Sequence, residues 1–241
     1  MKRADFLAAS TASALVARSQ DTSLPRSIAG IRIPDSALAK EATEIARNAV
    51  SAEIFNHSLR TFLFAELLAR AHRTSHDTEL VYVASIVHDT GLSARYMSAD
   101  RCFEVDGADV ARSLLERHAI NDARAGLVWD AVALHDNGGI ARWKEPEVQL
   151  VHAGVSADFG NMLEVLKRRD IVAVLNAAPR THFIPAFLDA CTTVAARKPQ
   201  TTAHSFVADI GYRRVAGFHL SNFVDDTKDD PFAAYIGKGK R

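Results

Sequence analysis

The sequence has few cysteines, no long apolar run and no excess of charge of either sign. Its two cysteines lie far apart and form no C-x-x-C pair, which argues against a disulfide scaffold or a cysteine-based zinc ribbon but leaves one disulfide open. No apolar run approaches the roughly 20 residues that span a bilayer. Lysine plus arginine equal aspartate plus glutamate at 29 each, so no net field recruits nucleic acid or an anionic membrane. A globular protein with a small-molecule partner is therefore expected.

The length and the two ends of the chain suggest three parts. At 241 residues, the chain can bury a full core as one domain, expected over 26–225. Residues 1–25 have the basic start and Ala-rich middle of a leader and resemble a twin-arginine export signal, although Ala4 stands where the second arginine belongs. An amphipathic extension is the equal alternative, so cytoplasmic and periplasmic locations both stay open. The polar end, 226–241, is expected to be mobile.

Between these ends, apolar residues recur at helical spacing in one segment after another. Pro34 to Ser36 is a helix-start signal, and residues 52–73 are apolar on nearly every side, which is typical of a helix at the centre of a bundle. No segment shows sustained period-two alternation. The prediction is an all-α, single-domain helical bundle. The expected helices cover 34–51, 52–73, 77–89, 106–120, 122–136, 145–166 and 184–196.

Four ionisable residues on these helices are candidate metal ligands. His57 and Asp158 share helix faces with apolar residues, so both point inward. A buried aspartate without a partner is strongly disfavoured and calls for a cation or several donors. His88 and Asp89 end an apolar helix, and both reach one ion only if the helix finishes there, as Gly91 indicates. The set of two imidazoles and two carboxylates suits Zn, Mn, Fe or Ni.

The order of these residues along the chain carries a family resemblance. By itself an inward histidine is more commonly a hydrogen-bonded core residue than a ligand. However, "FNHSLRTFLFA", then "VHDTG", then a later aspartate in an all-α chain resembles the HD superfamily of metal-dependent hydrolases. In that family the first His, the His-Asp doublet and the distant Asp bind the metal. The resemblance therefore implies His57, His88, Asp89 and Asp158 as ligands.

Further motifs narrow the resemblance to one branch. The stretches "NHSLR", "HDTGL", "FEVDGADVAR", "ALHD" and "ADFGN" are most similar to the cyanamide hydratase-like branch. Leu92 stands where the second-messenger phosphodiesterase branch usually has a lysine. The branch implies hydration of a small nitrile-like carbon to a urea or amide. The alternatives are an HD-type phosphohydrolase for nucleotides or phosphate esters, which needs several Arg or Lys residues near the metal, and a non-catalytic domain that keeps its metal for stability.

The expected mechanism uses one divalent ion, with Zn first and Mn, Fe or Ni as alternatives. An ion in an open site lowers the pKa of its water toward neutrality. Asp89 is the expected partner that orients this water or accepts its proton. His135 faces inward and is the candidate neutral donor for the developing negative charge. A second ion held by His135 or His152 stays the less favoured alternative.

The remaining candidates have weaker signals. Arg60, in the turn after His57, is a substrate-pocket residue for an anionic group or a structural ion pair. Glu104 is a pocket residue or a proton shuttle, whereas Asp106 fits a helix N-cap. The basic run at 167–170 is expected to be a solvated helix end and not a nucleic-acid patch. A homo-oligomer stays open.

Overall fold

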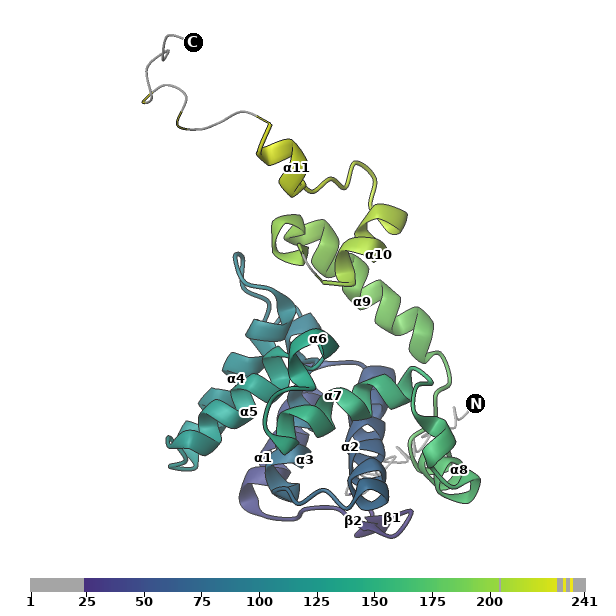
Figure 1. Cartoon of the computed structure of the whole chain (residues 1–241). Helices are drawn as coiled ribbons and strands as arrows, with labels where there is room; N and C mark the ends of the chain where they lie inside the picture. Colours follow the sequence, from purple (N-terminus) through teal and green to yellow (C-terminus); the bar gives the residue numbers. More distant parts are fainter. Residues whose placement is uncertain (1–23, 204, 229–231, 233–234, 236–241) are drawn as a thin grey trace, which may run out of the picture.

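The computed structural model describes residues 24–203, 205–228, 232 and 235 (Figure 1). Over these residues the regular structure is helical apart from one short antiparallel hairpin, which confirms the predicted all-α fold. The hairpin strands are β1 (Ser27–Ile28) and β2 (Ile31–Arg32), and the 3-10 helices are η1 (Thr90–Leu92), η2 (Leu163–Val165) and η3 (Pro199–Thr202). The α-helices are α1 (Ala37–Ala49), α2 (Ala52–His72), α3 (Thr78–Val87), α4 (Phe103–Arg117), α5 (Ala123–Ala133), α6 (Gly138–Ala141), α7 (Pro146–Asp158), α8 (Arg168–Ala177), α9 (Phe183–Arg197), α10 (Val207–Arg214) and α11 (Phe223–Asp226).

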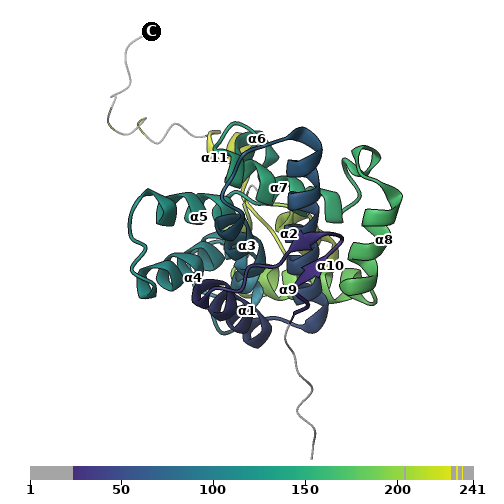
Figure 2. The ribbon, with the colours of Figure 1, turned by 90° about the horizontal axis from the view of Figure 1, so that it is seen from below.

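The helix α2 is the centre of the bundle, as its sequence predicted. Ser51 caps its start by accepting a hydrogen bond from the Ile54 backbone N–H. Arg73 ends it in the left-handed conformation with φ 57°. Between these residues most side chains are buried, because helices cover α2 on several sides. Viewed from below, α2 and α3 lie in the middle, with α4 and α5 to one side and α8 to the other (Figure 2).

Close contact between α7 and α2 depends on Gly154. A Cβ on Gly154 would overlap the backbone carbonyl of Thr61 and lie 3.1 Å from the Cβ of Ala65. The glycine therefore lets the two helix backbones approach more closely than side chains would allow. The approach brings the end of α7, with Asp158, beside His57 on α2.

The apolar interior forms two clusters. The larger one fills the space among α1 to α5 and α7, whereas the smaller one joins α9 and α10 to Ile54, Leu92 and Phe103. Figure 1 shows α9 and α10 above α1 to α5 and α7. The metal-ligand candidates lie where the two clusters meet, since His57 on α2 stacks on Phe183 of α9.

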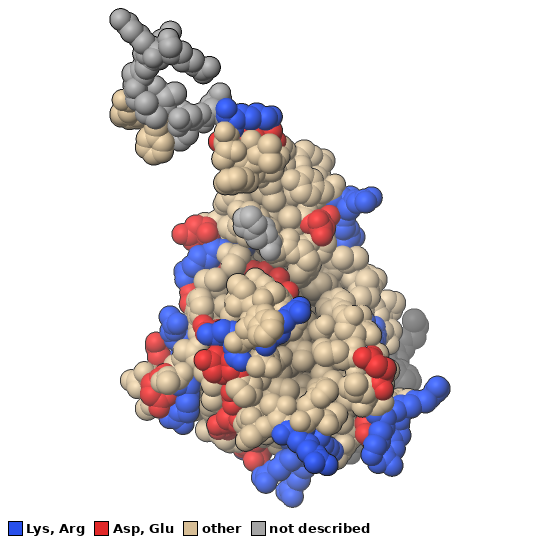
Figure 3. All heavy atoms as spheres, viewed as in Figure 1, with Lys and Arg blue, Asp and Glu red and all other residues tan. Residues whose placement is uncertain are grey.

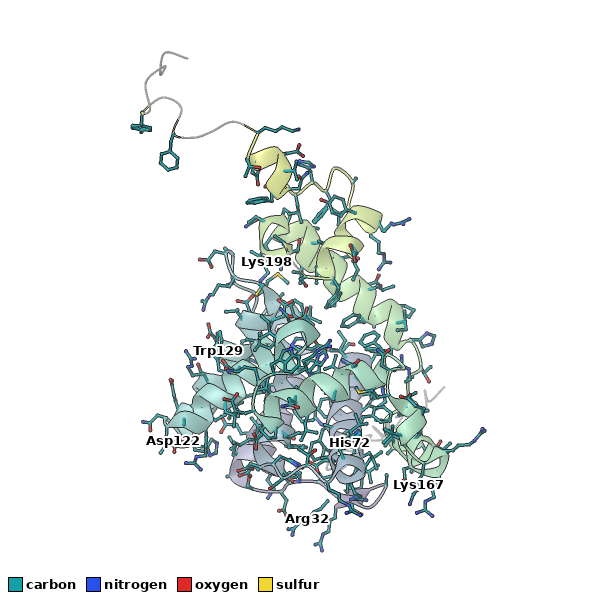
Figure 4. The ribbon with its side chains drawn as sticks, viewed as in Figure 1. Arg32, His72, Asp122, Trp129, Lys167 and Lys198 are labelled. Atoms are coloured by element: carbon teal, nitrogen blue, oxygen red, sulfur yellow. The ribbon has the colours of Figure 1, made fainter. Side chains whose placement is uncertain are left out.

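A buried ion pair joins the end of α9 to α4. Lys198, labelled in Figure 4, pairs with Asp106, and its Nζ donates to the Arg101 carbonyl at 2.6 Å. Both side chains of the pair are almost fully buried. The prediction that Asp106 is an N-cap is wrong, because α4 begins after Cys102 and Asp106 lies inside the helix. The cation that pairs with it is far away in the sequence, so the local pattern gave no signal for it.

Two other local predictions differ from the structure. The helix finishes near Gly91 as expected, since α3 stops at Val87, but Gly91 itself lies within η1 and has no positive φ. Instead, a Cβ on Gly91 would overlap the Phe103 carbonyl, so the glycine lets α4 approach the His-Asp doublet. The helix expected over 145–166 stops at Asp158, since Gly160 and Met162 have φ of 100° and 56°. The run at 167–170 is largely exposed and forms the first turn of α8, which agrees with the expected solvated helix end.

The surface carries charges of both signs around a largely uncharged middle area on the face shown in Figure 3. No helix in the described part of the chain is long and apolar enough to cross a membrane. The predicted leader-like stretch, 1–25, lies outside the described residues except for Leu24 and Pro25. Of the predicted tail, 226–241, the structure describes 226–228, 232 and 235.

The close approach at Gly154 makes a testable prediction. Gly154→Ala should lower the free energy of unfolding by about 1–3 kcal/mol, because the methyl group must push α7 away from α2. Gly126, in the exposed part of α5, has nothing within 4 Å of an added Cβ. As the matched control, Gly126→Ala should raise stability by about 0.5–1 kcal/mol. Urea unfolding measures both, and equal effects would contradict the close contact.

Candidate metal centre

Three buried side chains converge where α2, α3 and η1 meet. The Nε2 atoms of His57 and His88 lie 3.3 Å apart. Oδ2 of Asp89 lies 3.3 Å from Nε2 of His88 and 3.7 Å from Nε2 of His57. Ligands about 2.0–2.1 Å from a tetrahedral ion are about 3.3–3.4 Å from one another. The spacing of this trio therefore matches the spacing of metal ligands.

The hydrogen bonds of the two imidazoles leave their lone pairs facing each other. Nδ1 of His57 lies 2.7 Å from a carboxylate oxygen of Asp158, and Nδ1 of His88 lies 2.7 Å from the Ser85 carbonyl. Both partners are acceptors, so both Nδ1 atoms carry the hydrogen and both Nε2 atoms are unprotonated in the neutral rings. Two nitrogen lone pairs 3.3 Å apart repel unless a cation or a proton lies between them.

The carboxylate of Asp89 needs a cation for the same reason. Both of its oxygens are buried and have no hydrogen-bond donor among the described residues. A buried carboxylate without donors is strongly destabilising. A divalent ion would satisfy Asp89, His57 and His88 together, so the residues present fit the metal that the sequence implies.

The ionisation states also suit metal binding. Burial favours the neutral acid, but the imidazoles of His88 and His57 hold the pKa of Asp89 well below its usual range. Burial lowers the pKa of His57 and outweighs the bond to Asp158, so this ring is neutral near pH 7. Burial also opposes a charge on His88, but the Asp89 carboxylate raises the pKa of His88. A proton on His88 therefore competes with the ion as pH falls.

Asp158 contacts His57 but is not part of the trio, although the resemblance implied that it is a fourth ligand. Its Oδ1 accepts from Nε of Arg60 and pairs with Nη1 of Arg180, both at 2.7 Å. Its Oδ2 accepts from Nη2 of Arg60 at 2.8 Å and from Nδ1 of His57. In this arrangement the carboxylate orients His57, as carboxylate partners of metal-binding histidines do. Direct ligation by Asp158 stays a prediction.

Arg60 serves this network and is not among the residues that line the cavity beside the trio. Its guanidinium is fully buried and also donates from Nη1 to the carbonyls of Ala178 and Pro179, at 3.1 and 3.0 Å. It lies 5.0 Å from the ring centre of Phe183. Arg60 therefore connects α2 with the segment before α9, and the geometry favours the structural ion pair over the predicted substrate contact.

A cavity of about 320 Å³ adjoins the trio. No lysine or arginine is among the described residues that line it. Part of the lining is apolar and aromatic, and the rest carries carboxylate, imidazole, hydroxyl and amide groups. The lining residues are His57, Asp89, His135, Asp136, His152, Val155, Ser156, Phe159, Asn161, Phe187 and Phe206.

His135 lies inside the site, as predicted, but offers an acceptor. Its Nδ1 is 2.6 Å from the Val132 carbonyl, so the hydrogen of the neutral ring is on Nδ1. Its Nε2 faces Oδ1 of Asp89 at 3.8 Å. Burial lowers the pKa of His135, and His88 adds to the effect, which disfavours a second proton. A neutral donor role therefore does not match this tautomer, whose Nε2 can instead accept a hydrogen bond.

His152 lines the same cavity, and its Nδ1 lies 2.8 Å from the His135 carbonyl. Within the described residues, neither histidine joins a further group that could hold an ion. The predicted single ion agrees with this arrangement, and the number of ions stays a prediction.

Glu104 is buried beside the site and does not line the cavity. Its Oε1 accepts from Ser205 Oγ at 3.0 Å, whereas its Oε2 has no partner among the described residues. Burial, and then the negative charge of Asp136, raise the pKa of Glu104 to about 7. Its role as pocket residue or proton shuttle stays a prediction.

Residues after position 159 complete the site, and the sequence analysis missed them. Phe183 stacks on His57 with ring centres 4.8 Å apart and planes at 22°. Phe187 and Phe206 line the cavity, and Arg180 holds Asp158. The i, i+4 spacing of Phe183 and Phe187 shows one apolar helix face, but nothing local shows that this face meets a histidine.

The HD domain family model matches residues 54–159, which include the whole trio and Asp158. Over these residues the chain is similar to the HD domains of metal-dependent hydrolases and hydratases, as the motifs indicated. Two similar curated proteins are the cyanamide hydratases DDI2 and DDI3 of Saccharomyces cerevisiae (strain ATCC 204508 / S288c). Each is 27% identical over 180 residues, which cover 73% of this chain and 80% of the relative.

Metal titration can test whether Asp89 is a ligand and whether Asp158 only orients His57. Asp89→Asn should abolish stoichiometric binding of zinc, because it removes the anion of the trio. Asp158→Asn should weaken binding by about 10–100-fold, the usual effect of losing the partner of a histidine ligand. Competition with a fluorescent chelator near pH 7 measures both, and Asp109→Asn on the outside of α4 is the control. Equal loss in the two variants would instead make Asp158 a direct ligand.

Glu104 should make stability depend on pH. Its folded pKa of about 7 exceeds its ordinary value of 4.5, so the native state binds the extra proton between these values. The stability from Glu104 is therefore fully present below the ordinary pKa and is lost as pH rises through the folded pKa. Relative to wild type, Glu104→Gln should gain roughly 1–3 kcal/mol between about pH 5 and about pH 8. Urea unfolding tests this, with Glu116→Gln on the exposed face of α4 as control.

Proposed function

We propose that this protein hydrates a small, uncharged, nitrile-like substrate with one divalent ion, zinc being the first candidate. The observation that supports this proposal is the cavity beside the trio, where no described lining residue is a lysine or arginine. An anionic substrate would instead meet the carboxylates of Asp89 and Asp136 there. A neutral substrate avoids this repulsion and can use the polar wall for hydrogen bonds.

The residues of the site can divide the work of hydration. When bound, a divalent ion supplies a Lewis acid that brings the pKa of a coordinated water toward neutrality. His57, His88 and Asp89 would hold this ion, and Asp158 keeps His57 in the required tautomer. Nε2 of His135 lies beside Asp89 and can accept a hydrogen bond that orients the reacting water. Hydrogen-bonding groups on the polar wall, such as Ser156 and Asn161, face the space where the product amide would form.

The phosphohydrolase alternative has less support. It requires cations that converge on the reacting group, but Arg60 and Arg180 are committed to Asp158. Arg101 pairs with Asp109 on α4, and Arg95 lies over the ring of Tyr96. The cavity also disfavours a purely stabilising metal, for which a closed site without adjoining space is expected.

Metal removal and reloading should test the proposal. Zinc-loaded protein is expected to convert cyanamide or simple nitriles, whereas the chelated protein and His88→Ala should show no measurable turnover. His118→Ala is the matched control, because His118 pairs with Glu41 away from the cavity. Product formation is followed by chromatography, with p-nitrophenyl phosphate assayed in parallel. Metal-dependent phosphate release without nitrile hydration would favour the phosphohydrolase and contradict the proposal.

A further inference from the structure

One wall of the cavity is formed by the rings of Phe159, Phe187 and Phe206 together with Val155, and we call this set the aromatic wall. The rings of Phe187 and Phe206 stack with centres 5.8 Å apart and planes at 18°. Phe159 lies 5.5 Å from the ring centre of Phe187 and 5.5 Å from that of His57. The wall therefore extends without a break from the metal centre outward.

The exposure of the wall distinguishes it from ordinary core. Phe187 is buried, with 6% of its surface exposed, but Phe159 at the end of α7 is 45% exposed. An aromatic ring left half open to water forgoes the burial that would stabilise it. Exposed apolar surface that continues into a cavity is typical of a ligand site.

The size of the cavity exceeds what a very small substrate needs. Its 320 Å³ correspond to roughly ten water molecules at about 30 Å³ each. Cyanamide has three non-hydrogen atoms, so it would occupy roughly a third of this space or less. The rest would stay filled with water against an aromatic surface, which is unfavourable.

We propose that the substrate carries an apolar, flat group of about six to eight non-hydrogen atoms, such as a phenyl ring, which the aromatic wall binds. This inference rests on the proposed hydration activity. For a substituted cyanamide, the oxygen of water bonds to the nitrile carbon, and one π bond of the nitrile breaks. Its electron pair becomes a bond from nitrogen to hydrogen. The second water hydrogen then moves from oxygen to the same nitrogen as the remaining carbon–nitrogen π bond breaks and a carbon–oxygen π bond forms, which completes the carbonyl and the NH₂ group. The product is a substituted urea, and the apolar group is unchanged.

The aromatic wall and the metal centre come from different parts of the chain. The trio lies within the HD domain match at 54–159. Phe187 lies in α9, and Phe206 directly precedes α10. The C-terminal helices thus set the substrate side of the cavity, while the HD domain holds the reacting centre. Replacements in the wall should change substrate preference more than metal affinity.

A matched series of substrates tests the inference. Zinc-loaded, full-length protein is assayed with cyanamide, methylcyanamide and phenylcyanamide, which share the reacting group and differ in the apolar part. The value of kcat/KM for phenylcyanamide should exceed that for cyanamide by about tenfold or more, as expected for one aromatic contact. Calorimetry with the products should show tighter binding of phenylurea than of urea, which gives a readout that does not depend on turnover.

Variants assign the preference to the wall. Phe159→Ala, at a half-exposed position that tolerates truncation, and Phe206→Ala should each lower the ratio of kcat/KM for phenylcyanamide to that for cyanamide by about tenfold. Both should keep the zinc content of wild type, which is measured on the same samples. Phe223→Ala, at an exposed phenylalanine of α11 outside the cavity, is the control and should leave the ratio unchanged.

Each outcome decides a different claim. Turnover of cyanamide that equals or exceeds that of phenylcyanamide, with no effect of the two variants on the ratio, would overturn the aromatic wall as a substrate site and leave the hydration activity standing. No turnover of any cyanamide by zinc-loaded protein would contradict the proposed function, and the inference would fail with it. A phenyl preference that both variants remove would support both.

Discussion

The buried carboxylate of Asp158 connects the parts of the molecule that the site requires. It accepts hydrogen bonds from His57 and Arg60 on α2 and pairs with Arg180, which precedes α9. Four donors stabilise a charge that would otherwise be costly so deep in the protein. The helices α2 and α7 and the segment before α9 all meet at this carboxylate. The orientation of His57 therefore depends on how α7 and this segment pack against α2.

The trio of His57, His88 and Asp89 lowers the stability of the fold when no cation is bound. Two unprotonated nitrogens and a carboxylate without donors are packed together in the interior. Without a cation, each of these groups lowers stability, so the surrounding apolar core must hold them in place. Binding of an ion removes the unfavourable interactions of all three groups at once, so this lost stability adds to the affinity for the ion.

Much of this could be predicted from the sequence, and the rest depended on long-range contacts. Apolar periodicity identified the central helix and the inward direction of His57, because a helix with few polar positions must be surrounded. The pairing of Asp106 with Lys198 and of Arg60 with Asp158 joins residues about 90 to 100 positions apart, so no local pattern reports it. Likewise, the tautomer of His135 is set by a carbonyl three residues before it, which helix periodicity does not predict.

The ion pair between Lys198 and Asp106 has a consequence for how molecules reach the cavity. Separating α9 from α4 would leave two charges in a dry interior, which is far more costly than separating apolar surfaces. The helices α9 and α10 should therefore stay packed against α4. Substrate entry and product release should not require these helices to separate from α4. Phe159 lines the cavity and its ring is half-exposed. Reactants and products would therefore pass beside this ring, through an opening whose width depends on the rotamer of Phe159.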